Sequence, residues 1–167
     1  MKIAIYAGTF DPITRGHLSV IERASRLFDR LLIVIAINPG KAPLFSVQER
    51  LTMVDELTSG WPSVSSAHTD GYVVDFARRH GARYLVRGVR SCTEVEAEIA
   101  LANVNHELAP EIETVFIPAH PELSEVSSSR LKELAASGVD LARYCPLEIA
   151  RRLRERLGAG AEEQIHG

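Results

Sequence analysis

Short apolar runs alternate along this chain with stretches in which apolar residues recur at helical spacing. The runs at 2–7 and 31–37 are continuous and rich in branched side chains, which is typical of parallel strands covered on both faces. Shorter runs at 64–69, 83–86 and 114–117 predict further strands. We therefore expect a five-stranded sheet.

Amphipathic stretches separate these runs and predict helices. The first predicted helix begins at Gly16 or His17. The others span 46–57, 72–80, 93–108, 127–137 and 146–157. Capping boxes at Ser46–Glu49 and Thr93–Glu96 mark two starts, and Gly81 and Gly138 mark two ends. Because strands and helices alternate, we expect an α/β fold. Its doubly wound, Rossmann-like parallel sheet would carry C-terminal helices and bind ligands outside the carboxyl ends of its strands.

Length and charge narrow the picture. With 167 residues, the chain fits a single domain, which we place at 1–157, followed by a small, polar segment at 158–167 that we expect to be flexible. A net charge of −3 argues against a nucleic-acid partner. The sequence shows neither an apolar run long enough for a membrane nor a signal peptide, so a cytoplasmic location is expected. Cys92 and Cys145 are expected to be free thiols.

The turn after the first run is the most informative stretch. Gly8 allows the chain to turn, Pro12 keeps residues 9–13 out of regular structure, and a helix follows at about Gly16-His17. A helix N-terminus offers unpaired N–H groups and a positive dipole end, so it favours a phosphate. Gly16 removes a side chain that would block the anion, and His17 adds a donor that can become cationic.

The whole run, Gly8-Thr9-Phe10-Asp11-Pro12 followed by Thr14-Arg15-Gly16-His17, resembles the T/HxGH signature of the nucleotidyltransferase superfamily. In detail it resembles the bacterial phosphopantetheine adenylyltransferase family, and the likeness extends from about Ile3 to Leu157. The resemblance implies transfer of an adenylyl group from ATP to 4'-phosphopantetheine. The products would be dephospho-coenzyme A and pyrophosphate. It also implies Mg²⁺ carried on the ATP phosphates and a homohexamer.

The resemblance assigns roles to matching positions. The catalytic residues would be His17, Lys41 and Arg90. ATP would be bound by Thr9, Phe10, His17, Gly88, Val89, Arg90, Glu98, Leu123, Ser124, Glu125, Val126, Ser127, Ser128 and Ser129. Phosphopantetheine would be bound by Thr9, Lys41, Val73 and Arg87. No residue is assigned to a metal.

Independently of the resemblance, the chemistry fits these residue types. A phosphate monoester has a second pKa near 6, so at neutral pH it is already a nucleophile and needs no general base. The protein must instead bring two polyanions together and stabilise charge, which calls for cations and helix ends. Lys41, Arg87 and Arg90 follow predicted strands, where such a sheet places its site.

Plainer structural roles remain open for several residues. The three serines could only cap a helix, and Glu98, within a predicted helix, is most simply exposed. Asp11 could be a metal ligand, although a turn-forming role before Pro12 is favoured. His17 could be an exposed turn residue that caps the helix rather than a donor to phosphate.

Two stretches depart from the family pattern. The family commonly carries aromatic side chains at positions matching Leu123-Ser124-Glu125, and again at Val95 and Ala97, and this chain has none there.

Two alternative functions also stay open. One is another nucleotidyltransferase, acting on a mononucleotide or making a CDP-alcohol, and the other is a nucleotide-binding regulator without catalysis.

Overall fold

The protein is built on one parallel sheet. The computed structural model describes residues 1–40 and 42–163, with side chains described to Gly158. The strands are β1 (Ile3–Gly8), β2 (Arg30–Ala36), β3 (Val64–Thr69), β4 (Tyr84–Val89) and β5 (Glu113–Pro118). They lie in the order β3-β2-β1-β4-β5, and each neighbouring pair is parallel. The expected five-stranded, doubly wound sheet is confirmed, and its order changes direction beside β1.

The helices follow the predicted alternation. They are α1 (Arg15–Leu27), α2 (Val47–Thr58), α3 (Val73–Arg79), α4 (Cys92–Leu108), α5 (Ser128–Ala136) and α6 (Leu147–Glu163), with a 3₁₀ turn at Pro121–Leu123. α1 begins one residue before the expected start, and α6 continues past the expected end at Leu157. Among the described helices, none is long and apolar enough to cross a membrane.

The capping box predicted at the start of α4 is misplaced. Ser91, not Thr93, is the N-cap, and its side chain accepts a hydrogen bond of 3.2 Å from the Glu94 backbone N–H. The sequence holds two overlapping boxes, Ser91–Glu94 and Thr93–Glu96. Of the earlier box only the hydrogen bond to the Ser91 side chain is present, because the Glu94 carboxylate accepts from the backbone N–H of Arg90, at 2.7 Å, the residue before the N-cap. At α2, by contrast, both hydrogen bonds of the predicted Ser46–Glu49 box are present.

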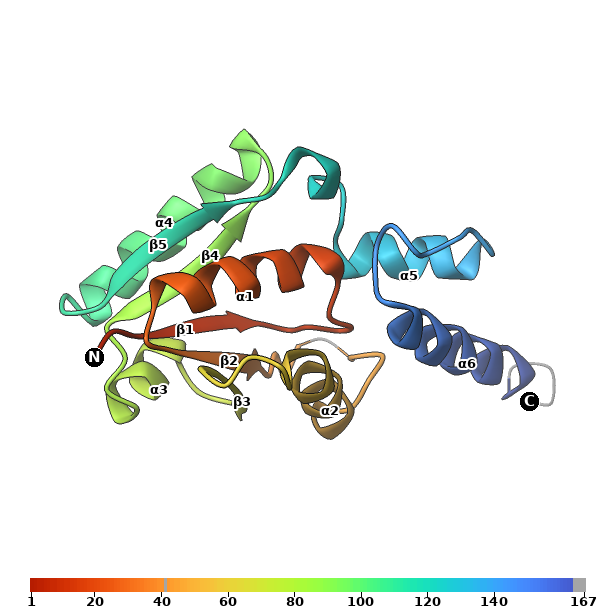
Figure 1. Ribbon diagram of the computed structural model, residues 1–167, viewed down its shortest axis with the longest axis horizontal. Coiled ribbons are helices and arrows are strands. Elements are labelled where there is room, and N and C mark those ends of the chain that lie inside the picture. Colours follow the sequence, from red (N-terminus) through yellow and green to blue (C-terminus); the bar gives the residue numbers. More distant parts are fainter. Residues whose placement is uncertain (41, 164–167) are drawn as a thin grey trace.

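Alternate residues of the central strands face two separate cores. On one face, Ala4 and Tyr6 of β1 pack with Ile21 of α1 and with residues of α2. On the other face, Ile5 and Ala7 pack with residues of α3. The period of two along β1 therefore explains why helices cover both faces of the sheet, as Figure 1 shows.

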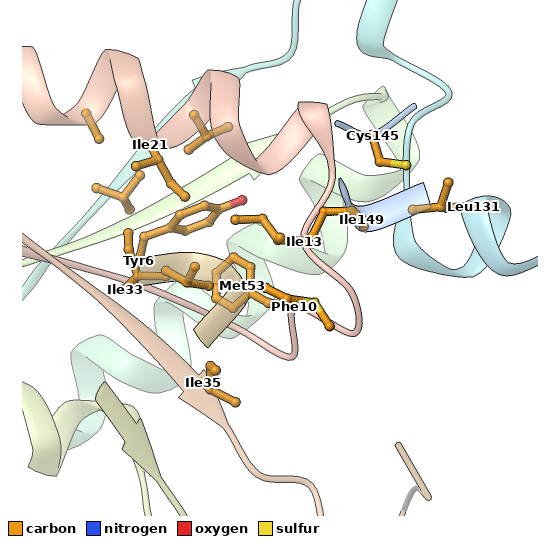
Figure 2. Close-up of a cluster of buried hydrophobic side chains, with 14 of the residues drawn as sticks. Tyr6, Phe10, Ile13, Ile21, Ile33, Ile35, Met53, Leu131, Cys145 and Ile149 are labelled. Atoms are coloured by element: carbon orange, nitrogen blue, oxygen red, sulfur yellow. The ribbon is translucent and has the colours of Figure 1, made fainter. Parts of the chain in front are cut away.

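The first core continues beyond the sheet to the C-terminal helices. Ile13, in the turn after β1, is fully buried and belongs to the same cluster as Leu131 of α5 and Ile149 of α6. Figure 2 shows these side chains next to one another, beyond the ring of Tyr6. Figure 1 shows α5 and α6 beyond the carboxyl end of β1. The C-terminal helices thus lie at the end of the sheet where the candidate residues gather.

Candidate functional site

Hydrogen bonds connect the turn after β1 to α2 and to the residues just before it. The carboxylate of Asp11 accepts hydrogen bonds from the backbone N–H groups of Leu44, at 2.8 Å, and Phe45, at 2.9 Å. The carbonyl oxygen of Thr9 accepts a hydrogen bond of 2.8 Å from Nη1 of Arg50. Asp11 therefore has a structural role in holding the turn, which agrees with the favoured interpretation of this residue.

His17 completes a capping box at the start of α1. Thr14 is the N-cap, and its hydroxyl accepts from the His17 backbone N–H at 3.3 Å. In return, the Thr14 backbone N–H donates to Nδ1 of His17 at 3.0 Å. Because Nδ1 is the acceptor, the neutral ring carries its proton on Nε2. His17 thus caps the helix and retains a donor, so the two roles considered for it are compatible.

The starts of α1 and α5 lie against each other. Ser127 is the N-cap of α5, and the hydroxyl of Ser128 donates to the Pro12 carbonyl oxygen at 2.8 Å. A Cβ atom at Gly16 would come within 3.3 Å of the Val126 carbonyl oxygen. A side chain at position 16 would therefore press these two helix starts apart. Both N-termini consequently lie at one site.

Cavity 1 opens between these helix starts and β4. Its volume is about 260 Å³. The predicted site residues that line it are Thr9, Phe10, His17, Arg87, Gly88, Val89, Arg90, Glu98, Leu123, Val126, Ser127, Ser128 and Ser129. These residues come from four separate stretches of the chain, so the fold brings together most of the positions assigned from the resemblance.

Glu98 is bound to Arg87 and is not the exposed helix residue that its position favoured. The guanidinium of Arg87 donates to both carboxylate oxygens of Glu98 at 2.6 Å, and it also donates to the Ala7 carbonyl oxygen at 2.9 Å. The Glu98 side chain is only 14% exposed. The expectation was wrong because Glu98 faces the end of β4, a contact made by tertiary packing.

Arg90 is paired in the same manner. Its guanidinium contacts Glu94 at 2.5 Å and donates to the Val126 carbonyl oxygen at 3.1 Å. The hydrogen bonds from Arg90 hold the pKa of the Glu94 carboxyl below its usual range. The two arginines and the two glutamates of cavity 1, Arg87 and Arg90 with Glu94 and Glu98, therefore balance in charge.

Burial keeps His17 neutral. Loss of hydration, together with the positive charges of Arg90 and Arg87, lowers its pKa to about 4. The expectation of a donor that becomes cationic is therefore wrong for the protein without ligands. The buried hydroxyl of Tyr6, which also lines this cavity, has a pKa raised above its usual range by burial. Both groups are thus neutral hydrogen-bonding partners at physiological pH.

Cavity 2, of about 460 Å³, adjoins cavity 1 and shares Thr9, Ser128 and Ser129 with it. Its charged lining residues are Asp11, Arg50 and Lys132, and Nζ of Lys132 lies 3.4 Å from the Asp11 carboxylate. Lys41, predicted to be catalytic, lies outside the described residues. Within the part of the chain that is described, no three His, Cys, Asp or Glu side chains gather as a metal site would require.

Some predicted binding residues lie outside the two cavities. Val73, at the start of α3, and Glu125 line neither of them. Ser124 lines a shallow groove beside Arg90. Leu123 does line cavity 1.

Four residues with ionisable side chains line the cavities without having been predicted from the sequence: Tyr6, Arg50, Glu94 and Lys132. A signal existed for Arg50, because it lies three residues after Val47 and four before Val54, on the apolar face of α2. A charged residue within an apolar stripe indicates a buried charge. Glu94 lies four residues after Arg90, so the two charges are close in the sequence, and they form an ion pair.

The chain is similar in sequence to several known proteins. Residues 5–134 match the cytidylyltransferase-like family. A phosphopantetheine adenylyltransferase of Heliobacterium modesticaldum is 40% identical over 158 residues, which cover 95% of this chain and 94% of that protein. The enzyme of that name from Lacticaseibacillus casei is 44% identical over 158 residues, covering 94% and 95%.

A solved structure supports the fold. It is titled a putative nicotinate-nucleotide adenylyltransferase from Vibrio parahaemolyticus and superposes with a TM-score of 0.66 at 19% identity. The match covers 92% of this chain and 99% of that chain. At this identity, the similarity is evidence for the shared fold alone.

Proposed function

This chain belongs to the phosphopantetheine adenylyltransferases of the cytidylyltransferase-like family, and on that premise we propose that it joins ATP to 4'-phosphopantetheine, giving dephospho-coenzyme A and pyrophosphate. The observation that carries the proposal is the convergence on cavity 1 of the N-termini of α1 and α5 with His17, Arg87 and Arg90. Helix N-termini and arginines bind phosphate groups, and this reaction joins two of them.

The reaction is an in-line displacement at the α-phosphorus of ATP. An oxygen of the acceptor phosphate forms a bond to that phosphorus, while the bond to the bridging oxygen of pyrophosphate breaks. Since the acceptor phosphate is already ionised, no group of the protein has to remove a proton. The protein contributes by holding the two anions in line and by stabilising charge at the α-phosphate.

The chain's own groups divide between the two substrates. His17 donates from Nε2 to an α-phosphate oxygen as charge develops there. Arg90, with the backbone at Gly88 and Val89 and the serine-rich start of α5, binds ATP. Thr9, Lys41 and Arg87 bind the acceptor phosphate. Mg²⁺ carried on the ATP phosphates, as substrate, would neutralise part of their charge.

We further propose a cytoplasmic homohexamer. In support, α4 has no buried residue, and Ile99, Leu101, Val104 and Leu108 on it are exposed. Apolar side chains that gather on one helix are typical of a contact between subunits.

Sedimentation velocity should show an assembly for the wild type and smaller species for Leu101→Glu. Leu147→Glu, at an exposed position of α6, is the control that should leave the assembly intact.

One assay tests the reaction. Purified protein is given ATP and Mg²⁺ with each of three acceptors, and pyrophosphate release is measured. Phosphopantetheine should support turnover, whereas nicotinate mononucleotide and glycerol phosphate should not. Comparable turnover with either of the latter two would favour another nucleotidyltransferase. Binding of ATP with no turnover on any acceptor would favour a regulator.

A further inference from the structure

Arg50 is a buried cation without an acidic partner among the described side chains. It lies on α2 and is 3% exposed. Nη1 donates to the carbonyl oxygen of Thr9 at 2.8 Å, and Nε donates to that of Ser46 at 3.3 Å. The ion pairs formed between described side chains do not include Arg50. Burying a charge is costly unless it is compensated, so this arrangement needs a reason.

The surroundings of Arg50 leave its charge uncompensated. Arg50 lines cavity 2, where the acidic residue among the described lining is Asp11. The Asp11 carboxylate already accepts from two backbone N–H groups and lies 3.4 Å from Lys132. With Arg50 and Lys132 against Asp11, the described charges of this cavity sum to one positive charge. A phosphate group in this cavity would compensate it.

Arg50 also acts on the geometry of the turn. Thr9 is followed by Phe10, which has a backbone φ of 46°, a left-handed conformation that non-glycine residues seldom adopt. Such a conformation persists only where neighbouring contacts hold it. The hydrogen bond from Arg50 to the carbonyl oxygen of Thr9, the residue before Phe10, is one of these contacts. The hydrogen bonds that the Asp11 carboxylate, in the residue after Phe10, accepts from backbone N–H groups are others.

We infer that Arg50 is a positioning residue. Its hydrogen bond to the Thr9 carbonyl oxygen fixes the Thr9–Asp11 turn against α2. Its positive charge, which no carboxylate among the described side chains pairs with, lies in the wall of cavity 2. A phosphate group of a substrate would therefore bind next to Thr9, which lines both cavities. The inference rests on the proposed function. The phosphate could belong to the acceptor, as a monoester, or to the pyrophosphate end of ATP, and the chemistry recognised is the same.

The experiment compares the full-length wild type with Arg50→Met and Arg50→Lys. The affinities for inorganic pyrophosphate and for phosphopantetheine are measured separately by calorimetry, together with kcat, both KM values and the Tm of the ligand-free protein. Arg50→Met should weaken binding of at least one ligand by about tenfold or more, the size of one lost charge-assisted contact. The Tm should fall modestly, because the carbonyl oxygen of Thr9 loses the donor that helps to hold the turn.

Arg50→Lys separates charge from geometry. It keeps the positive charge, so affinity should be largely restored. The ammonium group of a lysine cannot donate to both carbonyl oxygens in the fixed geometry of a guanidinium, so kcat should be about tenfold below the wild-type value. The control is Arg23→Met, because Arg23 also donates to a backbone carbonyl, that of Pro118, and lies outside both cavities. It should leave both affinities and kcat at wild-type values.

The outcomes are decisive for Arg50. If Arg50→Met binds pyrophosphate more weakly, the phosphate group next to Thr9 belongs to the pyrophosphate end of ATP. If it binds phosphopantetheine more weakly, that phosphate group belongs to the acceptor. If Arg50→Met does not fold, Arg50→Lys is judged by the same measurements. A lower Tm with unchanged affinities and kcat in both variants would overturn the inference, as would a wild type that binds neither anion. Pyrophosphate binding that depends on Arg50, without turnover on phosphopantetheine, would overturn only the proposed acceptor.

Discussion

In cavity 1, Arg87 and Arg90 each hold a glutamate, whereas in cavity 2 Arg50 holds two backbone carbonyl groups and no carboxylate among the described side chains. A phosphate that binds Arg87 or Arg90 in cavity 1 therefore competes with the carboxylate of Glu98 or Glu94. In cavity 2 the positive charge is already available. On the proposed function, the two phosphate groups of the reaction would therefore be bound by different electrostatic means.

The largest expected effect is at His17, in cavity 1. His17→Ala should lower kcat by about two to four orders of magnitude, because a donor to the α-phosphate is lost in the transition state. ATP affinity, measured by calorimetry, should change far less.

The same substitution should also lower the stability of the protein. Because His17 completes a capping box, His17→Ala should cost about 1 kcal/mol of stability. His17→Gln is the matched variant, since glutamine at this position also forms capping boxes. It should restore the Tm while kcat stays low. Near-full activity of His17→Ala would leave only the capping role.

A somewhat smaller effect is expected at Lys41, which adjoins residues of cavity 2 in the sequence. Lys41→Ala should lower kcat by about 10²–10³, by analogy with removing one electrostatic contact to a transition state. Steady-state kinetics should show this loss with little change in the KM for ATP. An unchanged kcat with a raised KM for ATP would make Lys41 a nucleotide-binding residue only.

Glu98→Gln tests whether the carboxylates of cavity 1 compete with phosphate. The substitution removes one negative charge from beside Arg87. If Glu98 only occupies Arg87, affinity for inorganic pyrophosphate should rise several-fold, and more at low salt than at high salt. If Glu98 binds ATP itself, as the resemblance implies, ATP affinity should fall instead. Calorimetry with both ligands separates these outcomes.

The remaining prediction concerns the pH dependence of stability. The pKa of His17 is about 4 in the folded protein, against 6.5 for an ordinary histidine. Between these values the unfolded chain binds more protons, so this residue's contribution to stability is present above pH 6.5 and is lost as the pH falls toward 4. Urea unfolding at pH 7 and pH 4.5 should therefore show a smaller loss for His17→Gln than for the wild type. Equal losses would contradict the burial of a neutral His17.

The sequence by itself determined the order of the elements, the parallel sheet and the place of the site. The continuous apolar run of β1, the capping box at Ser46 and the turn-forming Gly8 and Pro12 are local patterns, each formed by residues close together in the sequence. Local chemistry of this kind can be read from adjacent positions. The resemblance then assigned most of the residues that line cavity 1.

Only the tertiary structure decided which charges are paired. Arg87 meets Glu98 where α4 packs beside the end of β4, and Arg50 reaches Thr9 across 41 positions of the chain. An arginine in a sequence has many possible acceptors, and the one it binds is set by the packing of elements that are far apart in the chain. For this reason the sequence indicated cations at the ends of strands, while the fold alone decided which of them were already held by a carboxylate.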